Sequence, residues 1–478
     1  MDRMLGSMKD GGYLICDPDG NLSTPESFAP GEGQENFRIA VDKEALKIER
    51  KNTGQPEYLR LCRKFGVEWE PMSDIGHQRF NPQAALMFDL IADYAQETAQ
   101  SLGLPLFIIK GTNMFDLSQK PVSEHAELYG DRLYNIIDKE HNKAYVLRYA
   151  ACHQQFSLIK DWQISYTQIP FGAYELADGY RYEQSGENML CFRSRRMNLP
   201  DCHVFCSDPG QAEDWFLRLH DKIYEVIGEM DRDYEILANL SSPHAYIENK
   251  NLILSMLRSQ DKPALLHFYP KGLNYYWTLN VEYLMIDAMK REREIATVQI
   301  DVGNAERFGI QYTNELGQEC YPIILHTALT GSVERFMYLV MDSAIKMEES
   351  GRSGHLPLWL APEQVRLLPV SDAYLGKASE IAGQLEKERI RVGIDDRPET
   401  VGRKVRDSRT DWVSYDAVIG ERESNGSSLK VFDREADETQ EMSPQQLIDR
   451  IRDKMTGKPF RILYFPRDVS KRPHRSRN

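Results

Sequence analysis

The chain changes its pattern at residues 349–356 (ESGRSGHL), a short segment rich in glycine and serine. Before it, short apolar segments bounded by turn residues, among them AYVLRYAA, GYRYEQSG, CHVFC, TVQIDV and CYPIILHTAL, predict strands of one sheet. After it, strand and helix patterns alternate, which predicts a small domain with a largely parallel sheet. We therefore expect an N-terminal segment at 1–65, a large domain at 66–348, a linker at 349–356 and a second domain at 357–478.

Helical spacing of apolar residues predicts a helix from Pro82 to about Gly103, and LPLFIIK directly after it reads as a buried strand. Further helices are expected near 211–231, 250–260 and 332–348. Beyond the linker, VRLLPVS and RVGID read as strands, and AYLGKASEIAGQLEKERI reads as a helix.

The charge of the chain limits its contacts with nucleic acid. The 59 Lys and Arg against 73 Asp and Glu give a net charge of −14, which argues against a surface that coats nucleic acid. The segment from Arg450 to Asn478, however, contains ten basic residues and only two acidic ones. This segment is either a solvated basic surface or a nucleic-acid contact.

The seven cysteines are scattered, and no CxxC pair occurs. No signal peptide and no apolar run of about 18 residues is visible, so we expect a cytoplasmic protein without a membrane segment. In that compartment, a special cysteine is more often a metal ligand than half of a disulfide.

Side-chain alternation makes CHVFC informative. Asp201 and His203 share one face of the predicted strand, whereas Cys202 and Cys206 point to the opposite, apolar face and are expected to be core thiols. Taken singly, His203, or any other lone histidine or cysteine, is more often structural than a ligand. A Cys/His/His set would leave one position of a zinc ion open, as catalytic zinc sites do.

Two blocks resemble signature motifs of class II aminoacyl-tRNA synthetases. Residues 165–186 (SYTQIPFGAYELADGYRYEQSG) with 189–206 (MLCFRSRRMNLPDCHVFC) resemble the second motif, and 324–336 (ILHTALTGSVERF) resembles the third. More narrowly, the chain resembles the threonyl-tRNA synthetase family in its archaeal-type form. The family reads roughly Cys-Pro-x-His, Ser-Tyr-Arg-x-Leu-Pro, a His-Arg-x-Glu-x-Ser-Gly run and Asp-Ala-His-Ile-Phe-Cys. The similarity covers about residues 36–478.

The resemblance implies an α/β (α+β) fold with an antiparallel class II sheet of six to seven strands and flanking helices. The region 66–348 would be the catalytic domain, and 357–478 would be an α/β anticodon-binding domain. The family's zinc ligands fall on Cys152, His203 and His326. Zinc suits a mixed sulfur and nitrogen set.

The remaining site residues also follow from the resemblance. Asp201 and Gln299 match residues that line the amino-acid pocket. Arg181 matches the arginine that bridges the substrate carboxylate and the α-phosphate of ATP, a role that suits a permanently charged planar fork. The alternative for Arg181 is a surface ion pair with Glu183.

Glu183 matches the acid that reads the adenine edge, and Arg193 and Arg335 match arginines that hold the γ-phosphate. The alternative for Arg335 is a solvated helix start, although an arginine there opposes the helix dipole. His125 matches a histidine near the tRNA terminus that accepts a ribose hydroxyl proton. The alternative is an exposed loop histidine.

Several positions depart from the family pattern. Cys-Pro-x-His reads CHQQ, a glutamine before the zinc histidine is Leu199, the proline of the first motif is Thr112, and a tyrosine over the amino acid is assigned to Trp277. The 124 residues before His125 hold one histidine, so we expect no editing site on this chain. A separate trans-editing protein is then expected in the cell.

In the C-terminal region, Glu399, Lys404 and Arg406 are candidates for anticodon contact, and Arg409 is a weaker one. The resemblance therefore implies a homodimeric threonine–tRNA ligase that uses Zn²⁺, ATP and Mg²⁺ and binds tRNA(Thr). The alternatives are a class IIa enzyme for serine or another amino acid, and a non-catalytic paralogue that binds tRNA. The three ATP-holding arginines argue against the paralogue.

Overall fold

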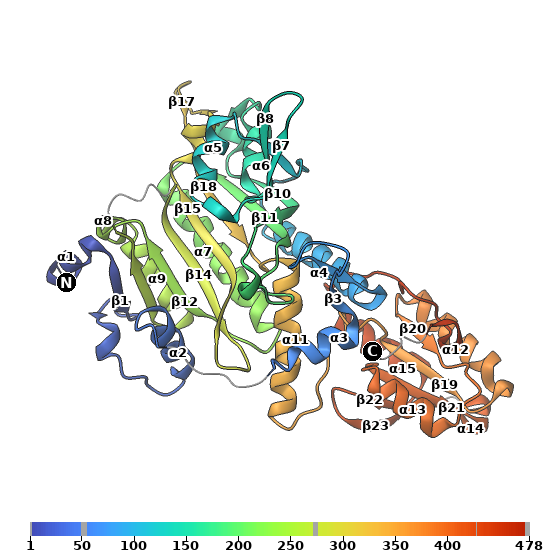
Figure 1. Cartoon of the computed structure of the whole chain (residues 1–478). Helices are drawn as coiled ribbons and strands as arrows, with labels where there is room; N and C mark the ends of the chain where they lie inside the picture. The colour runs from blue at the N-terminus through green and yellow to red at the C-terminus, as the bar shows by residue number, and fades with distance from the viewer. Residues whose placement is uncertain (1, 49–54, 271–275, 427, 474–478) are drawn as a thin grey trace. The chain divides into compact units, whose positions relative to one another are not determined.

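The computed structural model describes residues 2–48, 55–270, 276–426 and 428–473. Their contacts form two compact units. The first unit holds residues 1–56, 73–77 and 95–336, and the second holds 57–72, 78–94 and 337–478. Residues 57–72 and 78–94 thus group with the C-terminal part of the chain. Figure 1 shows the elements of both units.

A ten-stranded sheet forms the centre of the first unit. In spatial order its strands are β2 (Leu22–Ser23), β1 (Gly12–Cys16), β13 (Ala264–Phe268), β12 (Glu235–Leu240), β14 (Trp277–Ile286), β15 (Glu292–Asp301), β18 (Ile323–Ala328), β11 (Arg196–Cys206), β10 (Phe171–Tyr180) and β5 (Leu106–Ile108). The sheet is mixed, because β12 pairs with β13 and β10 pairs with β5 in parallel. It exceeds the expected six to seven strands, in part because the N-terminal segment adds β1 and β2 at one edge.

Helices cover both faces of this sheet. On one face, α7 (Pro209–Gly228) packs on β11, β15 and β18, and its His220 contacts Tyr283. The Asp208 side chain caps α7 by accepting a hydrogen bond from the Gln211 amide, as a good N-cap residue does. On the opposite face, α2 (Glu35–Glu44) packs Phe37 against the apolar side chains of β12 and β14. The sheet face that carries α2 is only partly covered, and its open part forms a wall of a cavity.

Other helices and small sheets complete the first unit. The helices are α1 (Asp2–Gly6), α5 (Lys120–Ala126), α6 (Cys152–Ile159), α8 (Pro243–Glu248), α9 (Lys250–Gln260) and α10 (Asn304–Phe308). The small sheets are β6 (Met114–Asp116) with β8 (Lys143–Leu147) and β7 (Asn135–Asp138), and β17 (Glu319–Cys320) with β16 (Tyr312–Thr313) and β9 (Ile164–Ser165).

Three strand expectations are wrong in detail. The segment AYVLRYAA contributes β8 to a separate sheet, and GYRYEQSG leaves the sheet after Tyr180. The strand in LPLFIIK is an edge strand, so Phe107 and Ile108 are 48% and 45% exposed rather than buried. An apolar run is typical of a buried strand, but it does not show whether the strand lies inside the sheet or at its edge.

The second unit contains a five-stranded sheet in the order β20 (Val392–Ile394), β19 (Val365–Pro369), β21 (Tyr415–Ile419), β22 (Leu429–Asp433) and β23 (Glu438–Met442). Only the β20–β19–β21 part is parallel, whereas β22 and β23 form an unpredicted antiparallel hairpin. Its helices are α12 (Leu375–Lys387), α13 (Val401–Thr410), α14 (Glu421–Asn425) and α15 (Pro444–Met455). The unit also holds α3 (Tyr58–Phe65), β3 (Val67–Trp69) and β4 (Gln78–Phe80).

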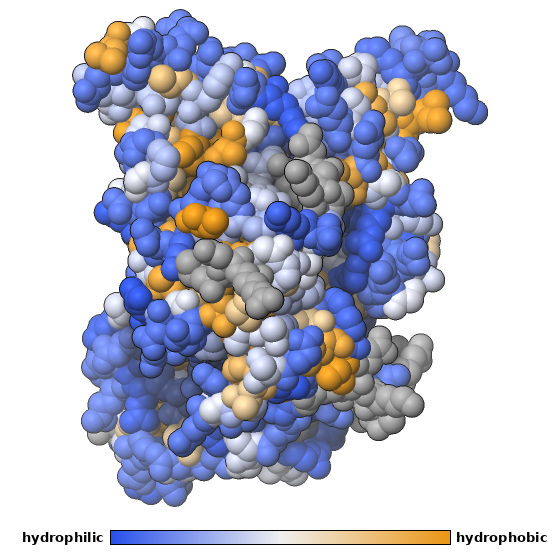
Figure 2. Space-filling view, turned by 90° about the vertical axis from the view of Figure 1, so that its left-hand side faces the viewer, coloured by the Kyte–Doolittle hydropathy of each residue, from blue (hydrophilic) through white to orange (hydrophobic). Residues whose placement is uncertain are grey.

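Two long helices have residues in both units. These are α4 (Pro82–Gln100) and α11 (Val333–Glu349), which confirm the helices expected at 82–103 and 332–348. No helix in the described ranges is long and apolar enough to cross a membrane. On the face shown in Figure 2, hydrophobic residues lie in small groups separated by hydrophilic ones.

Candidate active site

Three polar side chains lie side by side on adjacent strands of the large sheet. Strand register places Gln299 of β15 opposite His326 of β18, and His326 opposite His203 of β11. Asp201 lies two residues before His203 and on the same face, as predicted. Cys202 is 1% exposed and points the other way, which confirms its assignment to the core.

Cys152 completes a cluster with the two histidines. It is the first residue of α6, and its sulfur lies within 4.8 Å of one ring nitrogen of both His203 and His326. All three side chains are buried. Among the described residues, this is the one group of at least three histidine, cysteine or acidic side chains close enough to hold a metal ion.

The hydrogen bonds of the two histidines show which nitrogens carry protons. His203 Nδ1 lies 2.8 Å from Gln155 Oε1, and His326 Nε2 lies 2.7 Å from Asp301 Oδ2. Both partners are acceptors, so both of these nitrogens donate. In the neutral rings, the remaining nitrogens, His203 Nε2 and His326 Nδ1, then hold lone pairs that face each other at 3.0 Å.

Two lone pairs at this distance repel unless a cation lies between them. A metal ion bound to both nitrogens and to the Cys152 sulfur satisfies the arrangement, and the outer nitrogens already have the partners that metal-bound histidines usually have. One sulfur and two nitrogen donors suit zinc and leave a fourth position open. The residues therefore fit a catalytic-type zinc site.

A cavity of about 270 Å³ opens beside this cluster. It brings together most of the residues predicted for the site, namely His125, Cys152, Arg181, Asp201, Gln299, His326 and Arg335. Burial raises the pKa of Asp201 to about 7, an effect that His326 and Arg148 partly offset. The cavity thus combines the Cys/His/His cluster, carboxylates and guanidinium groups in one space.

A positively charged side chain, Arg181, and an uncharged one, His125, line this cavity. Arg181 donates from Nε to the Tyr149 carbonyl at 3.2 Å, and its guanidinium lies 5.3 Å from the Tyr129 ring centre. His125 is 5% exposed, and burial, together with Arg307 and Arg181, lowers its pKa to about 4. At neutral pH its imidazole is therefore uncharged and can accept a proton.

Glu183 and Arg193 pair with each other rather than line the cavity. Arg193 Nε and Nη2 lie 3.1 and 3.0 Å from Glu183 Oε2. Arg195, which is 3% exposed, donates to the Glu183 carbonyl at 2.7 Å and to both carboxylate oxygens of Asp74. The surface ion pair considered for Arg181 and Glu183 is not present.

Trp277 does not line the cavity, and its neighbour Tyr276 does. Tyr276 donates its hydroxyl to Gln299 Oε1 at 2.9 Å, and its ring centre lies 5.2 Å from that of His326. Trp277 is 6% exposed and contacts Tyr269. Tyr276, rather than the predicted Trp277, therefore contributes the aromatic ring of the cavity wall. Leu199 lies in the cavity wall, as expected.

The sequence analysis does not identify Gln155 and Asp301, which are the hydrogen-bond partners of His203 and His326. Side-chain alternation along TVQID places Asp301 on the same strand face as Gln299, which is a usable signal. The signal for Gln155 was weaker, because it occupies the last position of the departing CHQQ block. A helix spacing of three residues places Gln155 one turn from Cys152 and on the same side of α6.

The anticodon candidates have different environments. Glu399 forms an ion pair with Arg403 at 2.9 Å, and Arg406 is 72% exposed in its side chain. Lys404 is 3% exposed, and its Nζ donates to the Pro369 carbonyl at 2.9 Å. The assignment of Lys404 to RNA contact is wrong, because this ammonium is buried within the second unit. The Arg409 guanidinium lies over the Phe432 ring at 3.9 Å.

The basic segment from Arg450 is less positively charged at its surface than its composition implies. Several of its cations pair with carboxylates outside the segment: Arg450 with Asp433, Lys454 with Glu435, Arg461 with Asp93, Arg467 with Glu386, and Arg472 with Glu363. Arg475 and Arg477 lie outside the described residues. The count of basic residues therefore overstates the unpaired positive charge of this segment.

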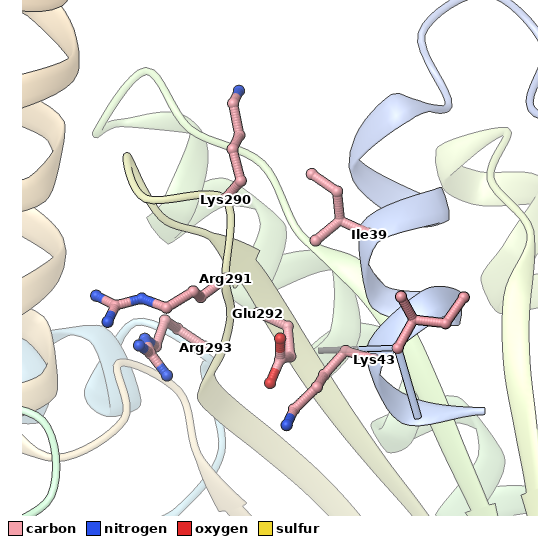
Figure 3. A pocket seen from close by; sticks show the side chains of 7 residues that line it. Ile39, Lys43, Lys290, Arg291, Glu292 and Arg293 are labelled. Atoms are coloured by element: carbon pink, nitrogen blue, oxygen red, sulfur yellow. The ribbon is translucent and has the colours of Figure 1, made fainter. Parts of the chain in front are cut away.

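A smaller hollow of about 200 Å³ lies between α2 and the turn that joins β14 to β15 (Figure 3). It is rich in cations, including Lys43, Arg291 and Arg293. Figure 3 shows both arginines on the opposite side of the hairpin from Lys43, and both donate to Asp287, at 2.9 and 3.2 Å. The cations do not converge on the hollow, so their positions do not form an anion-binding site.

Comparison with known proteins decides the family. The profile described as "tRNA synthetase class II core domain (G, H, P, S and T)" matches residues 134–344, and "Anticodon binding domain" matches 364–454. A threonine–tRNA ligase of Thermofilum pendens is 46% identical over 97% of this chain and 75% of its own length. The chain belongs to the threonine–tRNA ligase family. A threonine–tRNA ligase of Caldivirga maquilingensis is 47% identical over 96% of the chain and 74% of its own length.

Solved structures agree with this family at the level of the fold. The RNA-binding domain of threonyl-tRNA synthetase from Cryptosporidium parvum Iowa II has a TM-score of 0.72 and 23% identity, with 83% of this chain and 98% of that chain covered. Giardia lamblia prolyl-tRNA synthetase has a TM-score of 0.66 and 15% identity, with 84% and 78% covered. Both matches support the class II architecture.

Proposed function

We propose that this chain is a threonine–tRNA ligase, which uses Mg²⁺ and ATP to form threonyl-adenylate and then transfers threonine to the 3′ end of tRNA(Thr). The observation that carries the proposal is the Cys152, His203 and His326 cluster at the wall of the cavity that also holds Asp201 and Arg181. This cluster distinguishes a hydroxyl-bearing amino acid from its isosteres.

A bound zinc ion would supply a Lewis-acidic position for the amino group and side-chain hydroxyl of threonine. Cys152, His203 and His326 hold that position, and Asp201 accepts a hydrogen bond from the N–H of the neutral amino group. Valine lacks the hydroxyl, and it would leave a polar site unsatisfied. Sites built around a substrate hydroxyl reject such analogues by roughly 10⁴-fold or more.

Arg181 supplies the fixed positive charge of the activation step. Its planar fork holds the threonine carboxylate against the α-phosphate, where negative charge develops during in-line attack. Arg335 lies on the same cavity and donates to the Glu294 carbonyl at 2.9 Å, which orients its guanidinium. We assign Arg335 and Arg193 to the γ-phosphate and Glu183 to the adenine edge.

In the transfer step, His125 accepts the proton of the ribose hydroxyl that attacks the threonyl carbonyl. The new ester bond forms as the bond between the carbonyl carbon and the phosphate oxygen breaks, and AMP leaves. The lowered pKa of His125 keeps the imidazole neutral, as this role requires. His125 also lines the same cavity as Arg181.

Pyrophosphate exchange with each amino acid tests the proposal. We expect exchange with threonine, weaker exchange with serine, and none with valine. Exchange with serine or proline but not with threonine would contradict the assignment. Metal analysis of the same preparation is expected to find one zinc ion per chain.

We assign tRNA contact in the second unit to Glu399 and Arg406, within the region that matches the anticodon-binding profile. Filter binding with tRNA(Thr) and with anticodon-substituted tRNA tests this assignment. Equal affinity for both tRNAs would contradict it.

We further propose that the chain forms a homodimer through the β5 edge. Phe107 there is 48% exposed, and a largely apolar cavity of about 670 Å³ adjoins it, lined in part by Trp162 and Phe171. Light scattering is expected to give twice the chain mass, and Phe107→Glu is expected to shift it toward the monomer. A monomeric parent protein would contradict the proposal.

Serine keeps the hydroxyl that this site is proposed to bind. We therefore predict that the purified chain forms seryl-tRNA(Thr), which a separate trans-editing protein would remove. An acylation assay with serine tests this, and failure to accumulate seryl-tRNA would count against it.

A further inference from the structure

Gln155 is a fully buried polar side chain on α6 with 0% exposure. Its Nε2 donates to Asp201 Oδ2 at 2.8 Å and lies 3.4 Å from the Asp201 carbonyl oxygen. Its Oε1 accepts from His203 Nδ1 at 2.8 Å. Both ends of the amide thus bind residues of the candidate site.

The amide has only one way to satisfy both neighbours. A carboxylate accepts and cannot donate, so the amide nitrogen must face Asp201 and the amide oxygen must face His203. His203 Nδ1 then carries the proton. As a result, the lone pair of His203 Nε2 points toward His326 and Cys152, where a metal ion would be bound.

The amide also keeps the carboxylate apart from the histidine. Asp201 Oδ2 lies 3.4 Å from His203 Nδ1, farther than the amide oxygen. Without Gln155, Asp201 is the nearest acceptor for that N–H, and turning toward it would draw the carboxylate away from the cavity. His326 differs, because its outer nitrogen has a carboxylate partner of its own, Asp301.

We propose that Gln155 is a positioning residue that couples metal binding by His203 to amino-acid binding by Asp201. The proposal rests on the proposed function, since it assumes that zinc and threonine occupy this site. It predicts that one substitution affects both ligands. Binding of ATP, which depends on the arginines, is not affected.

Two substitutions at this position separate the two roles. Q155L removes both hydrogen bonds, so zinc affinity is expected to fall about 10- to 100-fold, as for other partners of metal ligands. The KM for threonine is expected to rise together with it. In Q155E at pH 8, the new carboxylate still accepts from His203 but repels Asp201, so zinc is retained while the KM for threonine rises.

Gln154→Leu is the matched control, because it makes the same change one residue away. Gln154 donates to Thr112 Oγ1 and does not reach the cluster. Zinc affinity is measured by chelator competition, and the absorption bands of the cobalt-substituted protein report the coordination geometry. Threonine and ATP KM values come from pyrophosphate exchange.

Q155L with zinc affinity and threonine KM within twofold of Gln154→Leu would overturn the proposal. Equal zinc loss in Q155L and Q155E would also overturn it, because packing alone would then explain the effect. The parent protein, measured in parallel, tests the proposed function separately. If it neither binds zinc nor exchanges with threonine, the function fails, whatever the variants do.

Discussion

Two buried glutamates, one in each unit, have opposite titration behaviour. Glu334 of the first unit is 3% exposed, and Glu363 of the second is 4% exposed. Burial raises the pKa of Glu334 to about 7, although the Asn198 amide donates to its carboxylate. Burial also acts on Glu363, but the guanidinium groups of Arg366 and Arg472 lower its pKa below the ordinary value.

The difference reflects how each unit uses its charges. In the second unit, the buried charge of Glu363 pairs with Arg366 and Arg472. In the first unit, Arg335 at the cavity pairs with Glu294, whereas Arg181 forms no ion pair with any described residue. Unpaired charge is what a substrate can bind, so the charge that matters for catalysis is the part that the fold does not neutralise.

The largest expected effect comes from breaking the pair in the second unit. Glu363→Gln leaves Arg366 buried with reduced compensation, and about 3–5 kcal/mol of stability is expected to be lost. Chemical unfolding measures the change. Glu380→Gln removes an exposed partner of Lys377 and serves as the control, with an expected change within about 0.5 kcal/mol. Equal effects of the two substitutions would contradict the comparison.

Removing the unpaired charge of the cavity should affect activity instead. Arg181→Ala is expected to lower kcat/KM for threonine-dependent exchange roughly 10²- to 10³-fold, as loss of one charge-stabilising donor does. Arg181→Lys should recover little, because an ammonium lacks the planar fork. Activity within threefold of the parent protein would exclude this role.

The pH dependence of stability should differ between the two glutamates. The folded-state pKa of Glu334 is about 7, above its ordinary value of 4.5, so the folded protein favours the protonated carboxyl. The stability that this preference contributes is complete below pH 4.5 and is lost as the pH rises through 7. The loss amounts to about 3 kcal/mol at most. Glu334→Gln should remove this decline. Glu363 shows the reverse pH dependence, because its pKa is lowered: its stabilising contribution is lost as the pH falls.

The smallest expected effects separate two cations on α13. Lys404→Met leaves the Pro369 carbonyl without its buried donor and should lower stability by about 1–2 kcal/mol without changing tRNA affinity. Arg406→Ala should leave stability within about 0.5 kcal/mol and weaken tRNA binding a few-fold. Thermal unfolding and filter binding provide both measurements, and a reversed result would contradict the burial of Lys404.

Part of the site follows from the sequence because strand alternation is local. The face shared by Asp201 and His203, and the opposite face of Cys202, depend only on neighbouring residues. The bond from Gln155 to Asp201 spans 46 residues, and no local pattern reports it. Lys404 illustrates the same limit, because a lysine in a charged helix gives no sign that its ammonium reaches a carbonyl 35 residues earlier.

The fold was predictable to a similar extent. Helix α4 and the strands of the motif blocks follow from their periodicity, whereas the exposed position of β5 depends on which strand pairs beside it. The ten-stranded sheet could not be predicted, because nothing near residues 12–23 specifies β13 as a partner.

The pairing of β1 with β13 has a consequence for synthesis of the chain. Cys16 lies opposite Ala264, so the first strand leaves the ribosome about 250 residues before its partner exists. At typical elongation rates of 5–20 residues per second, the edge of β1 that pairs with β13 remains open for on the order of 10–50 s, although its other edge can already pair with β2. The edge of the sheet can therefore close only after more than half of the chain has been translated, and a nascent chain stalled before residue 264 would present β1 to solvent or to chaperones.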